Sequence, residues 1–283
     1  MMKQIIHFII ILLICLTGCD TSSNDWFVVE RLDSRTYVIS EPNSSQGNSC
    51  FLIIGEKEAI LFDSGTGESK MRSITQVTDS LTKLPVTLLL SHFHFDHIGN
   101  INEFNRIGIP EIELLKNRLS ADKLLNLDRS EVLSKDKVTL KISRMYAVGK
   151  EIDLGNRRIK IVHTPGHSKE SISIIDNENE YVFTGDLVYN GLLLLNDCDA
   201  YIHSIDKIIN NSNSNYRIFG SHGKPEVNYE RLAQIKKAIE SHHAGNCINE
   251  SVHQINLFGF TKDVYKIGNI SFIDGYTDVF TKE

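Results

Sequence analysis

Short apolar runs separated by turn residues fill the chain between residues 26 and 62. These runs are four or five residues long and rich in β-branched and aromatic side chains, which pack well on a pleated surface. Pro42, Gly47 and Gly55 stand between the runs as turn formers. The pattern predicts a meander of short strands at residues 26–29, 36–40, 50–54 and 59–62.

The remaining chain alternates between the helical and the strand period. Apolar residues three and four positions apart predict helices at residues 68–81, 111–127, 198–209 and 226–245, and a helix can open at 99–104. Strand-like runs lie at residues 86–90, 158–162, 171–175, 181–183 and 216–219. Residues 128–142 follow neither period, and we expect the strand-like segment 265–280 to close a sheet edge or to cover the mouth of a site. This alternation predicts an α/β fold.

The first 25 residues differ from the rest of the chain. Residues 1–18 combine a lysine, an apolar run of about ten residues and a small-residue end, which is typical of a secretory signal and too short to span a membrane. The sequence LTGC at residues 16–19 resembles the lipobox of bacterial lipoproteins, in which the cysteine, here Cys19, carries the lipid. Residues 19–25 are small and polar, as a tether would be.

We therefore expect an extracytoplasmic protein that a lipid on Cys19 anchors to a bacterial membrane, on the periplasmic side in a Gram-negative cell. A plain signal peptide and an uncleaved anchor are the alternatives. The whole chain is 41% hydrophobic and has no internal repeat, so residues 26–283 predict one domain. The formal net charge of −6 comes without the basic stripe that phosphate binding needs, so we expect a small-molecule substrate and no nucleic acid. The oligomeric state stays open.

The cysteines offer no thiolate metal site. Removing Cys15 with the signal and assigning Cys19 to the lipid leaves Cys50, Cys198 and Cys247, an odd number with no CxxC pair. One disulfide with a free thiol, or three buried thiols, fits this count.

The chemistry of the chain concentrates directly after the apolar run at 86–90. Within six positions the sequence presents four metal-binding side chains: His92, His94, Asp96 and His97. In an extended backbone, side chains two residues apart point to the same side, so His92 and His94 can hold one ion while the next pair faces a second. Three imidazoles with one carboxylate favour zinc over magnesium or calcium. Because the chain has 11 histidines, a chance cluster is the weaker explanation.

The spacing His-x-His-x-Asp-His resembles the signature of the metallo-β-lactamase-fold hydrolases. Later motifs follow in that family's order: HTPGH ending at His167, TGD ending at Asp186, and the glycine-flanked His222. The resemblance implies a first metal site that His167 completes and a second that Asp186 and His222 complete, with Asp186 bridging two ions. The implied ligands are His92, His94, Asp96, His97, His167, Asp186 and His222. The implied fold is a four-layer αββα sandwich with the ligands at strand ends.

Other positions bear on the branch of the family. Asp186 stands near the place where the best-known β-lactam-hydrolysing branches have cysteine or serine, which points to the thioesterase, lactonase and esterase branches resembling glyoxalase II. Tyr189 has the spacing of a substrate-binding tyrosine in related acyl-homoserine lactonases, although a packed aromatic residue is the alternative. Asp63 either supports the metal centre, as in the family, or caps a turn or helix. Glu170 replaces a frequent glycine, and His163 is assigned a structural hydrogen bond.

These implications give one main hypothesis. Two zinc ions, for which iron or manganese could substitute, would lower the pKa of a bound water toward about 7 and provide a hydroxide that attacks an ester, thioester or lactone. Asp96 would orient this nucleophile, and Tyr189 would bind the substrate. These two are therefore the candidate catalytic residues. The alternatives are a metallo-β-lactamase acting on β-lactam antibiotics, an iron-dependent redox enzyme, and a non-catalytic metal-binding lipoprotein.

Overall fold

The computed structural model describes residues 25–134, 137–246, 250–257 and 259–276. The predicted signal peptide and Cys19, the predicted site of lipid attachment, lie outside these residues, as does Cys247. Within them, Cys50 and Cys198 are free, buried thiols. No helix in this described part of the chain combines the length and the apolar character that a membrane crossing requires.

The first of two central sheets has seven strands in the order β1-β2-β3-β4-β5-β6-β9. Its members are β1 (Val28–Asp33), β2 (Thr36–Ser40), β3 (Ser49–Ile54), β4 (Ala59–Phe62), β5 (Val86–Leu89), β6 (Ile107–Glu111) and β9 (Arg144–Ala147). The first four strands pair antiparallel in sequence order, which confirms the predicted meander. Strands β5, β6 and β9 then add in parallel, so the end of β5 opens toward one edge of the sandwich.

The second central sheet has six strands in the order β10-β11-β12-β13-β15-β16. They are β10 (Glu151–Asp153), β11 (Arg158–His163), β12 (Ile172–Asp176), β13 (Tyr181–Phe183), β15 (Arg217–Phe219) and β16 (Glu226–Val227). Buried side chains from both sheets fill the space between them; the Phe51 and Phe183 rings, for example, lie 4.9 Å apart. Packing of this kind between two apolar faces is what holds a β-sandwich together.

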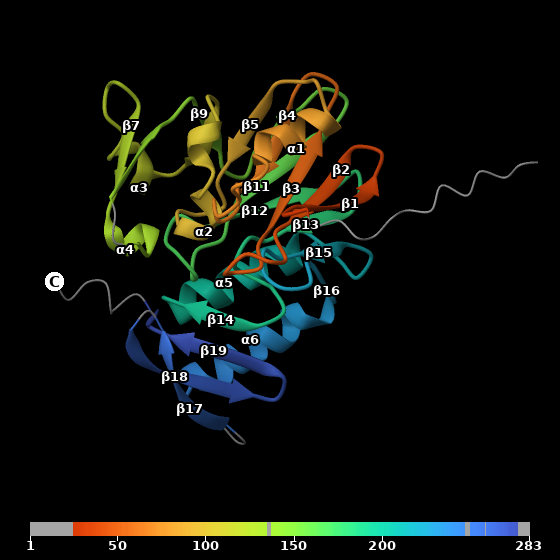
Figure 1. The fold of residues 1–283 in the computed structure, drawn as a ribbon. Helices are drawn as coiled ribbons and strands as arrows, with labels where there is room; N and C mark the ends of the chain where they lie inside the picture. The colour runs from red at the N-terminus through yellow and green to blue at the C-terminus, as the bar shows by residue number, and fades with distance from the viewer. Residues whose placement is uncertain (1–24, 135–136, 247–249, 258, 277–283) are drawn as a thin grey trace, which may run out of the picture.

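Helices cover the outer faces of both sheets, which confirms the four-layer αββα sandwich (Figure 1). Helix α1 (Ile74–Leu81) lies on the first sheet with the short α2 (Phe95–Ile98), α3 (Glu113–Lys116) and α4 (Arg129–Val132), and a 3-10 turn at Ile101–Glu103. Helices α5 (Cys198–Asn210) and α6 (Glu230–His243) lie on the second sheet. Helix α1 begins later than predicted because Ser73 and Gln76 form a capping box at its start.

The prediction of one helix at residues 111–127 was wrong. Strand β6 occupies its beginning, α3 lasts a single turn, and β7 (Leu124–Leu127) pairs with β8 (Val138–Lys141) in a two-stranded sheet. In β7 the buried Leu125 and Leu127 flank the exposed Asn126, which is the strand period. Helix α3 already ends at Lys116, and Lys123, directly before β7, has a φ of 60°, which a right-handed helix does not allow. The leucine content of this segment did not show whether its apolar residues follow the helical or the strand period.

A third sheet lies beside the sandwich, in the order β14-β19-β18-β17 (Figure 1, lower part). It joins β14 (Leu192–Leu195) to β17 (Glu250–Leu257), β18 (Phe260–Ile267) and β19 (Ile270–Asp274). One face packs on α5 and α6, and the other carries an apolar cluster with Leu133 and Phe95. The described part of the predicted 265–280 segment, residues 265–276, therefore extends neither central sheet, and residues 277–280 lie outside the described chain. Tyr276, two residues after the end of β19, contacts the predicted ligand His94.

Candidate metal centre

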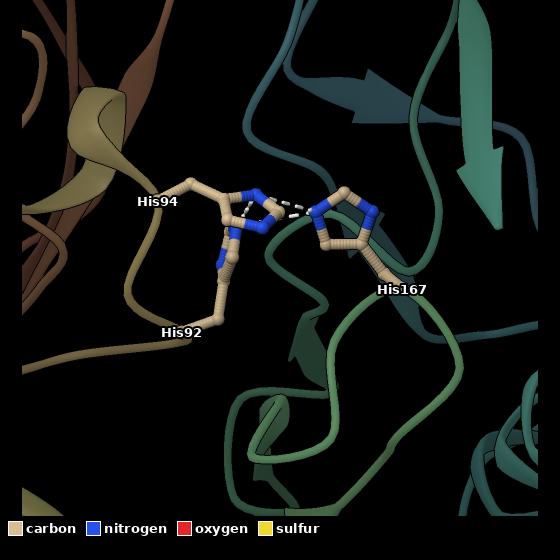
Figure 2. Close-up of side chains that lie close together, drawn as sticks. All are labelled: His92, His94 and His167. Carbon is tan, nitrogen blue, oxygen red and sulfur yellow. Dashed lines mark hydrogen bonds between the residues drawn. The ribbon is translucent and has the colours of Figure 1, made fainter. Parts of the chain in front are cut away.

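Three of the predicted ligands meet at one point. His92 and His94 follow β5, and His167 comes from the loop between β11 and β12, on the other sheet (Figure 2). The three nitrogen atoms that face one another are 2.9 Å apart between His92 and His94, 3.2 Å between His92 and His167, and 3.0 Å between His94 and His167. Nitrogen ligands of one tetrahedral zinc ion, bound at about 2.0–2.1 Å, lie roughly 3.3 Å apart.

A second group lies directly beside the first and contains the other four predicted ligands. The Asp186 carboxylate approaches His222 Nε2 to 2.9 Å, His97 Nε2 to 3.3 Å and His167 Nε2 to 3.5 Å. Asp96 Oδ2 is 3.6 Å from both His97 Nε2 and His222 Nε2. Asp186 is thus the carboxylate that contacts both groups, the position that a bridging ligand would take.

Two buried atoms in this cluster have no hydrogen-bond partner among the described residues: His97 Nε2 and Asp186 Oδ1. They lie 3.3 Å apart. Leaving a buried polar atom unsatisfied costs about 1–3 kcal/mol, so each such atom requires an explanation, of which a missing ion is one. A cation bound by both would remove this penalty, and the residues present therefore fit a metal ion.

Each of the five histidines is held at its other nitrogen. His167 Nδ1 and His222 Nδ1 donate to the carbonyl oxygens of Leu194 and Gln46, at 2.8 and 3.1 Å. Asp63 Oδ2 lies 2.8 Å from His97 Nδ1, while His92 Nδ1 contacts Ser91 Oγ at 2.8 Å and His94 Nε2 contacts Tyr276 Oη at 3.2 Å. Because a carbonyl or a carboxylate only accepts, the bonds of His167, His222 and His97 place a proton on the outer nitrogen, and the contacts of His92 and His94 with hydroxyl groups are compatible with the same arrangement.

Charge states agree with this assignment. Burial lowers the pKa of His92 and of His94 well below its ordinary value, and the neighbouring imidazoles lower it further. Both rings are therefore neutral near pH 7, which is the form that binds metals.

Around Asp96 and Asp186, the neighbouring charges outweigh burial and favour the charged forms of the His97 and Asp186 side chains. Burial disfavours the charged form of His97, but Asp186, Asp96 and Asp63 outweigh it and hold the pKa of His97 well above the ordinary value. Burial likewise acts against ionised Asp186, yet His222 and His97 keep its pKa well below the usual range. This part of the site attracts positive charge, which a proton or a divalent cation can supply.

Asp63 supports the site from behind, so of its two predicted roles the geometry shows the supporting one. Besides contacting His97, it accepts the Ser91 backbone N–H at 2.6 Å through Oδ1, at the start of the ligand loop. Its φ of 67° is uncommon for a residue with a side chain, and such strain clusters at functional sites.

The HTPGH loop orients its two histidines differently. His167 faces the cluster, whereas His163 Nε2 bonds to the Lys169 carbonyl at 2.8 Å, the structural role assigned to it. Gly166 has a φ of 129°, and a Cβ there would lie 2.4 Å from the Tyr201 Cα, so glycine is required. Glu170 is buried, which raises its pKa to about 7, and its Oε1 accepts the Phe93 N–H at 3.3 Å.

A cleft of about 270 Å³ opens onto the cluster. It is lined by His94, Asp96, His167, Asp186, His222 and Tyr189, and by the apolar side chains of Phe95, Leu133, Leu192, Leu194 and Leu257. The Tyr189 ring packs 5.0 Å from the His222 ring, and its hydroxyl donates to the Leu192 carbonyl. The catalytic role assigned to Tyr189 stays a prediction.

Sequence reasoning missed Tyr276. Its hydroxyl donates to the His167 carbonyl at 2.7 Å and can accept from His94 Nε2, and its ring stacks on the His167 ring at 5.4 Å. It is fully buried. No local pattern marks this residue, because the contact joins positions 182 residues apart.

The fold and the site together define a class: an αββα sandwich with a buried histidine and carboxylate centre suited to divalent metals. The family model for the Metallo-beta-lactamase superfamily matches residues 46–234, and the chain belongs to this superfamily.

Curated relatives point to hydrolysis. The chain is 28% identical over 200 residues to an acyl-coenzyme A thioesterase, MBLAC2, of Gallus gallus, which covers 61% of this chain and 70% of the relative. It is 31% identical over 147 residues to the probable metallo-hydrolase YqgX of Bacillus subtilis (strain 168), with 52% and 68% covered. Family and relatives identify the chain as a hydrolase.

Solved structures agree on the fold. A metallo-beta-lactamase from Pontibacter korlensis superimposes with a TM-score of 0.59 at 14% identity, covering 76% of this chain and 99% of that one. A metallo-beta-lactamase family protein from Thermus thermophilus, TTHA1429, gives a TM-score of 0.55 at 18% identity, covering 76% and 81%.

Proposed function

We propose that this chain hydrolyses thioesters with the help of two divalent metal ions, zinc being the ion that suits the ligands best. The observation that carries the proposal is the orientation of five buried imidazoles. All five hold their outer nitrogen in a contact outside the cluster and turn the inner one toward it. Such preorganisation is typical of a metal site and not of a packed core.

The residues divide between two ions. His92, His94 and His167 would hold the first, and Asp96, His97 and His222 the second, with Asp186 in reach of both. Bound metal would supply an activated water and polarise the substrate carbonyl. The Asp96 carboxylate lies at the cleft and would orient the attacking water, while Asn48 Nδ2 fixes the Asp96 backbone carbonyl at 2.8 Å.

The leaving group argues for a thioester. A thiol has a pKa near about 8.5, so a thiolate departs near neutral pH without an acid, whereas an amine leaving group requires a proton. Burial raises the pKa of Tyr189 well above its ordinary value, and its hydroxyl already donates to the Leu192 carbonyl. A substrate that needs no proton donor suits this cleft.

The lining of the cleft favours an apolar acyl group. Leu133, Leu192 and Leu257 form part of its wall, and none of the described residues that line it is a lysine or an arginine. The β-lactam antibiotics carry a carboxylate that a cation would stabilise. We therefore rank an acyl thioester above a β-lactam as the substrate, and relatives named acyl-coenzyme A thioesterase support this order.

Elemental analysis of residues 20–283, combined with a turnover screen, tests the proposal. The screen would compare an acyl thioester, a lactone, nitrocefin and a phosphodiester, before and after chelation. We expect close to two zinc ions per chain and fastest turnover of the thioester, lost on chelation and restored by zinc. Fastest nitrocefin cleavage would instead support a β-lactamase, and native iron a redox enzyme.

We also propose that the enzyme is a lipoprotein attached through Cys19 to the outer side of a bacterial membrane. The support is the apolar run and the LTGC sequence before a polar tether. The wild-type chain should fractionate with membranes and Cys19→Ser with the soluble fraction. Equal membrane association of both chains would refute lipid anchoring at this cysteine.

A further inference from the structure

A second cavity lies next to the metal cleft. It measures about 510 Å³ and shares Asn190, Gly191 and Leu192 with the cleft, so the two are neighbours along this loop. Its apolar residues, Ile255 and Val264, belong to the same face of the C-terminal sheet as the Leu257 of the cleft. A substrate with its carbonyl at the metals can therefore extend over this face.

Arg231 is the cation of this cavity. It lies in the first turn of α6, and its Nε donates to the Tyr189 carbonyl at 3.0 Å, which ties the guanidinium to the loop between the two cavities. No carboxylate among the described residues forms an ion pair with it. Burial lowers its pKa, and the neighbouring Tyr201 and Tyr189 act against this shift without cancelling it.

Several other arginines have a carboxylate partner, whereas Arg35 and Arg72, which are also half-buried, form no ion pair among the described residues. Arg118 pairs with Glu131, Arg157 with Asp176 and Arg217 with Glu226. A half-buried guanidinium without a counter-ion carries a desolvation penalty, and it keeps donors available for an oxyanion. Asn269, Ser271 and His253 add polar groups around the same cavity.

We infer that the Arg231 cavity binds an anionic group, a phosphate or a carboxylate, on the leaving-group part of the substrate. The inference rests on the proposed thioester hydrolysis and names the class of thiol: one that carries an oxyanion at a distance from its sulfur. Guanidinium recognises both oxyanions through paired N–H donors. The acyl chain would then occupy the leucine-lined part of the metal cleft.

Three thioesters of one acyl group separate the possibilities. Coenzyme A carries phosphates, glutathione carries carboxylates, and N-acetylcysteamine carries neither. We expect Arg231→Gln to raise KM for an anionic thioester by about tenfold or more, the size of one charge-assisted hydrogen bond, and to leave KM for the N-acetylcysteamine thioester unchanged. A rise of KM for the coenzyme A thioester would identify phosphate as the bound group, and a rise for the glutathione thioester would identify carboxylate.

The control is Arg158→Gln, which removes the same charge from a largely exposed side chain on β11. It should leave all three KM values unchanged. Arg231→Lys keeps the charge without the paired donors and should fall between wild type and Arg231→Gln. An equal rise of KM for all three thioesters would mean that Arg231 only shapes the loop at Tyr189, and no rise for any would remove it from substrate binding.

A binding measurement separates this inference from the proposed function. ADP has phosphates but no thioester. Because Arg231→Gln changes none of the predicted metal ligands, we expect any contact of ADP with the metals to be the same in wild type and variant. Calorimetric titration of the metal-loaded proteins should give weaker ADP binding to Arg231→Gln than to wild type, with Arg158→Gln unchanged. If no thioester is hydrolysed but this difference persists, the anion site stands and the proposed function fails; equal ADP affinities and no substrate-specific change in KM refute the anion site.

Discussion

Two of the buried polar clusters in the sandwich, the metal centre and the group around Arg157, differ in whether their polar atoms have partners. At the metal centre, side chains converge and two atoms lack a partner. Around Arg157, every contact is matched: Nε and Nη2 donate to Asp176 Oδ2, Nη1 donates to the Arg35 and Ile54 carbonyls, and Nη2 donates to Thr36 Oγ1. Arg157 and Asp176 are both buried, as the ligands are.

The two clusters lie at opposite ends of β12. Its first residue, Ile172, donates to the Ser91 carbonyl in the ligand loop, and its last residue is Asp176. One cluster joins the two sheets, because Arg157 binds β12 on one sheet and the ends of β2 and β3 on the other. At the metal centre the sheets are joined by the Ile172–Ser91 backbone bond and by ligand side chains that converge from both sheets. Burial alone therefore does not mark a functional site; unmatched atoms within a preorganised cluster do.

The largest expected effect separates the two histidines of the HTPGH loop. His167→Ala should lower turnover by far more than the roughly 100-fold loss that an outer-shell substitution causes, because it removes a ligand atom. His163→Ala, in the same loop, should keep most activity, since in the described part of the chain that ring bonds only the Lys169 carbonyl. Steady-state rates and bound metal per chain measure both. Equal losses from the two variants would remove His167 from the metal centre.

Removing the carboxylate partner of Arg157 should have the opposite result: a large loss of stability with little loss of activity. Asp176→Ala leaves the Arg157 guanidinium buried and unpaired, which costs about 3–5 kcal/mol of unfolding free energy. Turnover per folded molecule and metal content should stay near wild type. Urea unfolding with parallel activity measurements tests this, and Asp176→Asn is the milder variant if the alanine variant does not fold. A loss of metal without a loss of stability would contradict the comparison.

The local sequence was sufficient for much of the centre. Strands β2, β4 and β13 have the predicted bounds, and the four ligand segments are short motifs whose spacing directly sets which side chains share a direction. It was insufficient where contacts join distant residues. The Arg157 bonds to Arg35 and Thr36 span more than 120 residues, and the Tyr276 contact with His94 spans 182. A lone tyrosine or arginine has no period or motif that reveals such a partner.

Glu170, which contacts the ligand loop, should make the free energy of unfolding depend on pH. Its pKa is about 7 in the folded chain against 4.5 for an ordinary glutamate, so between these values the folded state binds more protons. Its contribution to the free energy of unfolding is therefore fully present below pH 4.5 and is lost as pH rises through 7, by about 3 kcal/mol. Glu170→Gln should equal wild type near pH 4 and exceed it above pH 7.

Only the difference between Glu170→Gln and wild type isolates this group, because the ligand histidines titrate in both proteins. Glutamine keeps an oxygen that can accept the Phe93 N–H. Urea unfolding of the metal-free proteins at several pH values measures the difference. A difference that does not change with pH would show that Glu170 stays ionised in the fold.

The smallest expected effect concerns Tyr276, which lies in neither cluster but binds two ligand segments. Tyr276→Phe removes the hydroxyl that His94 Nε2 contacts and that binds the His167 carbonyl, and both groups then stay buried without it. Loss of such an outer partner should weaken metal affinity about 10- to 100-fold. Zinc competition with a chelator and the visible spectrum of the cobalt-substituted protein measure this.

The control, Tyr146→Phe, removes another buried phenol, from the core between the sheets. If both variants lower only the melting temperature and leave zinc affinity intact, Tyr276 is a packing residue; a loss of affinity confined to Tyr276→Phe shows that the C-terminal sheet holds the ligands in place.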